Sequence, residues 1–138
     1  IDVGSARLFF DVVGEGLDAA TPKMEKRPTL ILLHGGPGYD HSTLRPYFDR
    51  YSDTHQIIYL DHRGCGRSTG ARETWHLDQW ADDLAVFCKK LGIDSPIVFG
   101  QSFGDIFGFV MCSGEGLDWR IIWKSVEGTY TPPAHGKA

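Results

Sequence analysis

Uninterrupted runs of apolar residues recur along the first hundred positions of the chain. They cover Thr29 to Leu33, Ile57 to Leu60 and Ile97 to Phe99. Runs of this length, without polar alternation, are typical of strands buried on both faces of a parallel sheet. The pattern therefore predicts three buried strands.

Apolar residues at helical spacing predict two helices between these strands. In Ser42 to Tyr51 they lie three and four residues apart, and Ser42 or Thr43 can cap the start of the helix. From Trp75 to Leu91 they form one continuous stripe, and Gly92 is placed to end that helix as a left-handed C-cap.

Alternating strands and helices predict an α/β fold with a mainly parallel sheet and right-handed crossovers. Before the first buried run, Ser5 to Val13 predicts another strand, Gly14 to Gly16 a turn, and Leu17 to Pro28 a polar loop. Repeats and linkers are not evident, so we assign residues 1–138 to a single domain.

A polar, glycine-containing motif directly follows each buried strand. Because ligands bind beyond the carboxyl ends of parallel strands, we expect the three motifs to converge on one site. The motifs are His34-Gly35-Gly36-Pro37-Gly38, Asp61-His62-Arg63-Gly64-Cys65-Gly66-Arg67-Ser68 and Gly100-Gln101-Ser102-Phe103-Gly104.

The last motif fits the G-x-S-x-G nucleophile elbow, in which a sharp turn from strand to helix exposes the serine hydroxyl. Ser102 would attack a carbonyl carbon and form an acyl-enzyme. Backbone N–H groups of His34 to Gly38 and of Phe103 are placed to stabilise the oxyanion. Taken alone, the serine motif is better explained as a Gly/Ser-rich turn at the end of a strand, and the glycine-rich loop is explained equally well as a tight turn. His34 itself is expected to orient its loop by hydrogen bonding.

In this order and spacing, the three motifs resemble the amino-terminal half of an α/β-hydrolase, and in particular the proline iminopeptidase group. The resemblance covers about Ser5 to Gly104. It implies that Ser102 is the nucleophile and that Gly36 and Phe103 donate to the oxyanion, whereas Asp61 to Ser68 braces the floor of the site. Related lactonases, esterases and C–C hydrolases carry similar loops, so amide, ester and lactone substrates stay open.

In this superfamily an acid and then a histidine follow the serine. His135 is the only histidine after Ser102 and is thus the candidate base, with Glu127 the acid in the correct order. Glu127 adjoins an expected strand and His135 lies in a tail containing two prolines, so we expect no working triad from them. We predict an incomplete domain without lid, acid, base and last strands, and an altered stretch between Asp105 and Glu127.

Composition narrows the function further. The chain has 138 residues, of which 41% are hydrophobic, and a net charge of -4. From this composition we predict a soluble domain without nucleic-acid or membrane partners. Three widely spaced cysteines favour reduced thiols in the cytoplasm over disulfides. The six histidines lack ligand spacing, so we predict no metal or cofactor and treat each histidine first as a polar or surface residue.

Two other interpretations stay open. Gly64-Cys65-Gly66 follows a strand as a dinucleotide-binding turn would, although Gly70 comes one residue late for that motif. We rank this below a serine hydrolase that acts on a small amide, ester or short peptide. The second alternative is a non-catalytic binding module whose open sheet edge accepts a second copy or a complementing chain.

Overall fold

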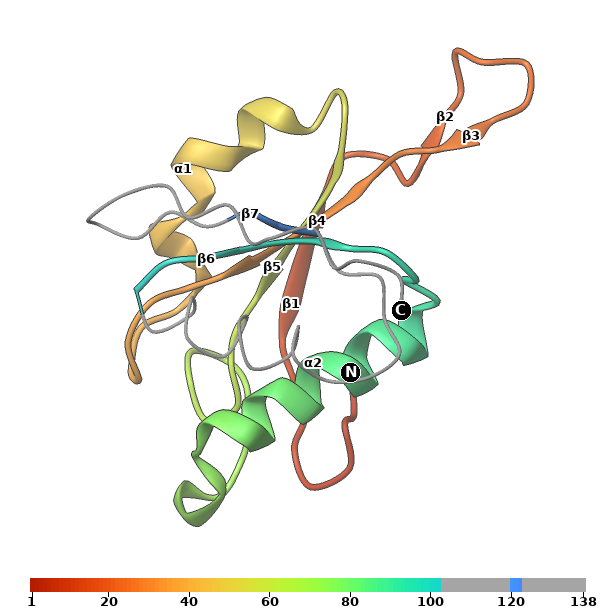
Figure 1. Cartoon of the computed structure of the whole chain (residues 1–138). Coiled ribbons are helices and arrows are strands. Elements are labelled where there is room, and N and C mark those ends of the chain that lie inside the picture. Colours follow the sequence, from red (N-terminus) through yellow and green to blue (C-terminus); the bar gives the residue numbers. More distant parts are fainter. Residues whose placement is uncertain (103–119, 123–138) are drawn as a thin grey trace, which may run out of the picture.

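The computed structural model describes residues 1–102 and 120–122, and every structural statement below concerns these residues. Figure 1 shows a central sheet with a helix on either side and a small hairpin that projects away from it. In chain order, the strands are β1 (Phe10–Val13), β2 (Leu17–Asp18), β3 (Glu25–Lys26), β4 (Thr29–Leu33), β5 (Gln56–Leu60), β6 (Ile97–Gly100) and β7 (Arg120–Ile122), and the helices are α1 (Arg45–Phe48) and α2 (Leu77–Leu91).

The main sheet confirms the predicted α/β class. Its strand order is β1-β5-β4-β6-β7. The strands β5, β4, β6 and β7 run parallel to one another, and only β1 pairs antiparallel, with β5. β2 and β3 form the separate antiparallel hairpin.

The uninterrupted apolar runs bury both faces of the sheet, as predicted. From β4, Ile31 and Leu33 pack into the cluster that contains Leu84 and Phe87 of α2. Leu32, between them in sequence, packs into the opposite cluster with residues around α1. Successive strand residues point to opposite faces, so a strand covered on both sides needs apolar side chains at every position.

Helix α2 forms where the apolar stripe predicts it. It begins at Leu77, because the Nδ1 atom of His76 accepts a hydrogen bond from the Gln79 N–H and caps the first turn. It ends at Leu91, and the next residue, Gly92, has a φ of 64° and is the predicted left-handed C-cap.

The single helix predicted for Ser42 to Tyr51 is wrong. Two 3₁₀ turns, His41–Thr43 and Asp49–Tyr51, flank the four-residue α1. Pro46 explains the break, because proline has no N–H to donate and is tolerated only in the first turn of an α-helix. The first 3₁₀ turn is capped by Asp40, whose Oδ1 accepts from the Ser42 N–H at 2.8 Å, and not by Ser42 or Thr43.

The segment before β4 also differs from the prediction. The expected strand from Ser5 to Val13 is reduced to β1, and Ile1 to Leu8 instead form a narrow turn with an Asp2–Arg7 bridge. The expected loop from Leu17 to Pro28 contains the β2–β3 hairpin. Two-residue strands are too short to produce a recognisable hydrophobic alternation.

The predicted altered stretch between Asp105 and Glu127 lies mostly outside the described residues. Its described part is β7, which pairs parallel to β6.

Within the described part of the chain, no helix combines the length and hydrophobicity needed to cross a membrane.

Candidate active site at the carboxyl ends of the strands

The three motifs leave the sheet at the same level. Leu33, the last residue of β4, is in register with Leu60 at the end of β5 and with Gly100 at the end of β6. The loops that follow these strands therefore begin side by side, which confirms that the three motifs start at one edge of the sheet.

Ser102 has the backbone conformation expected of an elbow residue. Its φ is +55°, although it is not glycine, and the residue is exposed. A left-handed conformation costs a non-glycine residue about 1–3 kcal/mol, and such residues cluster at functional sites. Just before it, the Gln101 N–H donates to the Leu33 carbonyl at 3.0 Å and ties the turn to the end of β4.

The glycine-rich loop after β4 lies directly against this turn. A Cβ atom at Gly35 would lie 3.1 Å from the Gln101 carbonyl oxygen and 3.5 Å from the Ser102 Cβ. Glycine thus permits an approach that any side chain would crowd. Gly36, the next residue, has a φ of +54° and lies beside the ring of Tyr39. The other predicted site residues, Phe103 and His135, lie outside the described residues.

His34 and His62 form a buried pair beneath the loop. Their rings stack with centroids 4.0 Å apart. The His62 N–H donates to His34 Nε2 at 3.2 Å, and His62 Nε2 lies 2.9 Å from the His34 carbonyl oxygen. This confirms that His34 holds the loop by hydrogen bonding.

Burial keeps both rings neutral. It lowers the pKa of His62 to about 3, with the nearby His34 adding to the effect, and it also lowers the pKa of His34. Since His34 Nε2 accepts a hydrogen bond, its proton belongs on Nδ1, which faces the Gly35 carbonyl oxygen at 3.0 Å.

Asp61 is fully buried and satisfied by hydrogen bonds. Its Oδ1 accepts from the backbone N–H of His41 at 2.9 Å and lies 2.8 Å from Nδ1 of the same histidine. Its Oδ2 accepts from the Arg67 N–H at 3.0 Å. Ser68 Oγ donates to the Asp61 carbonyl at 2.7 Å, so the loop folds around its own first residue.

Arg63 joins this loop to α2. Its guanidinium makes two 2.7 Å hydrogen bonds to the carboxylate of Asp83, and both side chains are almost completely buried. These bonds raise the pKa of Arg63 further. Trp80 Nε1 donates to the Arg63 carbonyl at 3.2 Å. The loop therefore braces the site, as the resemblance implies.

The dinucleotide-binding interpretation of Gly64-Cys65-Gly66 does not fit. The position of a Cβ at Gly64 is occupied by the ring of Trp75, and that of a Cβ at Gly66 by the carboxylate of Asp61. The missing side chains of these two glycines thus make room for Trp75 and Asp61 of the chain itself. Cys65 is buried, and burial raises the pKa of its thiol, so it is a packing residue of the loop.

Sequence reasoning missed two partners of this loop. We treat each histidine first as a polar or surface residue, and the surface alternative is wrong for His34, His41 and His62, which are buried polar residues. No periodicity marks His41, because it lies in a 3₁₀ turn of only three residues. Asp83, in contrast, borders the apolar stripe of α2, and a carboxylate in that position signals a buried cation.

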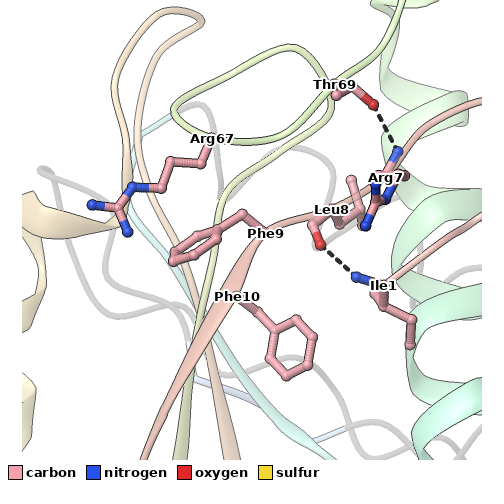
Figure 2. Close-up of a pocket in the computed structure, with 7 residues that line it drawn as sticks. All are labelled: Ile1, Arg7, Leu8, Phe9, Phe10, Arg67 and Thr69. Atoms are coloured by element: carbon pink, nitrogen blue, oxygen red, sulfur yellow. Dashed lines mark hydrogen bonds between the residues drawn. The ribbon is translucent and has the colours of Figure 1, made fainter.

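A separate hollow of about 300 Å³ lies near the edge strand β1. Figure 2 shows Arg67 and Phe9 in this lining, and the guanidinium carbon of Arg67 lies 4.8 Å from the centroid of the Phe9 ring. The backbone N–H of Arg7 donates a hydrogen bond to the Thr69 hydroxyl oxygen at 2.9 Å. The lining of this hollow does not include Ser102 or Gly35.

In the described ranges, 1–102 and 120–122, no cluster of three or more His, Cys, Asp or Glu side chains is arranged to hold a metal ion.

This fold and this arrangement of loops define an α/β hydrolase, and comparison with known families agrees. Residues 28–113 match the family described as alpha/beta hydrolase fold, so the chain belongs to that family.

Among characterised relatives, the chain is 34% identical over 124 residues to a proline iminopeptidase of Clostridioides difficile strain 630. The match covers 88% of this chain and 35% of the relative. The chain thus spans about a third of the length of this relative.

Solved structures of hydrolases share this fold. A proline iminopeptidase-related protein from Thermus thermophilus superposes with a TM-score of 0.70 and 26% identity over 81% of this chain and 38% of that protein. An esterase from a marine microorganism superposes with a TM-score of 0.71 and 25% identity over 86% of this chain and 41% of the esterase.

Proposed function

We propose that this chain carries the nucleophile and part of the oxyanion hole of a serine hydrolase similar to proline iminopeptidases. One observation carries the proposal: Ser102 is exposed, has a φ of +55° at the end of β6, and lies against Gly35 of the glycine-rich loop. A serine that merely ended a strand would need neither the strained backbone nor the close approach of a second loop.

In the proposed reaction, Ser102 Oγ attacks the carbonyl carbon of the substrate while a base accepts its proton. The N–H groups of Gly36 and Phe103 stabilise the oxyanion of the tetrahedral intermediate. The intermediate collapses, the amine or alcohol leaves with a proton, and water then hydrolyses the acyl-enzyme. His135 is the histidine of this chain that follows the serine, and it is the candidate base.

A small amide or short peptide is the proposed substrate class. Support comes from the proline iminopeptidase of Clostridioides difficile, whereas the likeness to a marine esterase makes esters the second class. Hydrolysis of proline p-nitroanilide and of p-nitrophenyl acetate separates the two. Oxyanion hole and binding alone sustain about 10³- to 10⁴-fold catalysis over water, so slow ester turnover is expected even without a working base.

Labelling with a fluorophosphonate probe tests the nucleophile. The expected result is labelling of the wild-type chain and of Ser95→Ala, which alters an exposed serine before β6, and loss of labelling in Ser102→Ala. A folded wild-type chain that resists the probe would instead support the alternative, a non-catalytic module that binds a second copy or a complementing chain.

The proposed compartment is the cytoplasm. Cys65 and Cys88 are both buried free thiols, as expected of a protein that folds under reducing conditions.

A further inference from the structure

The glycine-rich loop has little apolar packing of its own. Between His34 and His41, the residues are only partly buried or exposed, and Tyr39 has 64% of its surface exposed. Such a segment is expected to sample many conformations unless its ends are fixed. Oxyanion donors, however, must be in place before the reaction begins.

The first fixed point is His34, at the start of the loop. Its backbone carbonyl and its ring nitrogen both bond to His62, at 2.9 and 3.2 Å. Both residues are buried, so these hydrogen bonds are shielded from competing water.

The second fixed point is His41, where the loop ends. Its backbone N–H and its ring Nδ1 both bond to Oδ1 of Asp61, at 2.9 and 2.8 Å. His41 has 9% of its surface exposed and Asp61 none. The same carboxylate accepts from Arg67 with its other oxygen, so it cannot turn away from His41 without losing a bond.

Asp61 and His62, two consecutive residues of the loop after β5, thus hold opposite ends of the glycine-rich loop after β4. We infer that His41 and Asp61 are positioning residues that fix Gly35 and Gly36 in the orientation needed for oxyanion stabilisation. This inference rests on the proposed function for its catalytic meaning, but the rigidity that it requires is measurable without any reaction.

The test combines loop dynamics with probe labelling in the full chain. In wild type, backbone order parameters of Gly36 and Gly38 from ¹⁵N relaxation are expected near ~0.85, as in the strands, and values below ~0.6 would overturn the inference. This measurement needs no variant and remains decisive if a substitution prevents folding.

Substitution of His41 then tests its role directly. His41→Ala is expected to lower the order parameters of Gly36 and Gly38 and to slow labelling of Ser102 by about tenfold, because a charge-assisted hydrogen bond is lost. His41→Asn retains an N–H near the Nδ1 position and is expected to restore both. His55→Ala, at the opposite end of the sheet beside β5, is the matched control and should change neither.

The outcomes separate the inference from the proposed function. Unchanged loop dynamics and labelling in a folded His41→Ala variant would overturn the inference and leave the nucleophile intact. A wild-type chain that is not labelled would contradict the proposed function, while the order parameters would still decide whether His41 and Asp61 fix the loop.

Discussion

The two loops that meet at the candidate site differ in how the chain holds them. In the loop after β5, Asp61, His62, Arg63 and Cys65 are all buried and bonded or packed. The loop after β4 has its middle exposed. We call the loop after β5 the support, because it has a buried interior of its own. We call the loop after β4 the working surface, because its middle is exposed, and we infer that its conformation depends on the support.

Loss of the buried ion pair should have the largest effect on stability. Asp83→Ala leaves Arg63 buried without its carboxylate, which is expected to cost about 3–5 kcal/mol. Urea unfolding measures the change. As a control, Arg45→Ala removes the partly exposed pair with Asp11 and should cost under about 1 kcal/mol. Equal losses in the two variants would contradict the distinction.

The next effect concerns one glycine in each loop. At Gly66, with a φ of +53°, an added Cβ would lie 2.6 Å from the Asp61 Cγ, whereas at Gly38, with a φ of +98°, it meets nothing within 4 Å. Gly66→Ala is expected to cost about 2–4 kcal/mol through backbone strain and overpacking combined, and Gly38→Ala only the strain. A larger loss for Gly38→Ala in urea unfolding would reverse the assignment of support and surface.

Acidification should weaken the support through His62. The pKa of His62 is lowered to about 3 in the folded chain, so between about pH 6.5 and 3 the unfolded chain binds more protons and stability falls as the pH falls. From about pH 7.5 to about pH 5.5, this group alone should remove on the order of 1 kcal/mol.

The measurement is the free energy of unfolding at both pH values in wild type and His62→Asn. The variant lacks this group and should lose less stability on acidification. Asp11 and Asp40 have lowered pKa values, so neither contributes to the difference above about pH 5. An unchanged pH dependence in the variant would contradict the neutral, buried state of His62.

The smallest effect is expected on the working surface. Tyr39→Ala removes a ring that is 64% exposed, so the free energy of unfolding should change by less than about 0.5 kcal/mol. A loss above about 2 kcal/mol, approaching that of a buried aromatic residue, would show that the loop has an interior of its own.

Regular periodicity made the layered part of the fold predictable. The stripe of α2 and the apolar runs of β4 and β5 encode burial residue by residue, so the strands, the helix and the α/β class follow from the pattern. Pro46 interrupts the helical pattern around α1 without altering its hydrophobic spacing, and this explains why the prediction failed there.

The site was predictable as motifs but not as contacts. Ser102 and Gly36 belong to recognisable spacings. The hydrogen bond between His41 and Asp61, in contrast, joins a short 3₁₀ turn to a loop residue 20 positions away in the sequence. Secondary-structure propensities depend on neighbouring residues only, so they cannot predict such a pair. The parallel pairing of β4 with β5 brings the two residues together.

The most direct test of the central claim, that Ser102 is held as a nucleophile, is peptide mapping of the chain after fluorophosphonate treatment. We predict modification at Ser102 and none at the exposed Ser95, with labelling abolished in Ser102→Ala. Modification spread over several serines, or labelling that persists in Ser102→Ala, would contradict it.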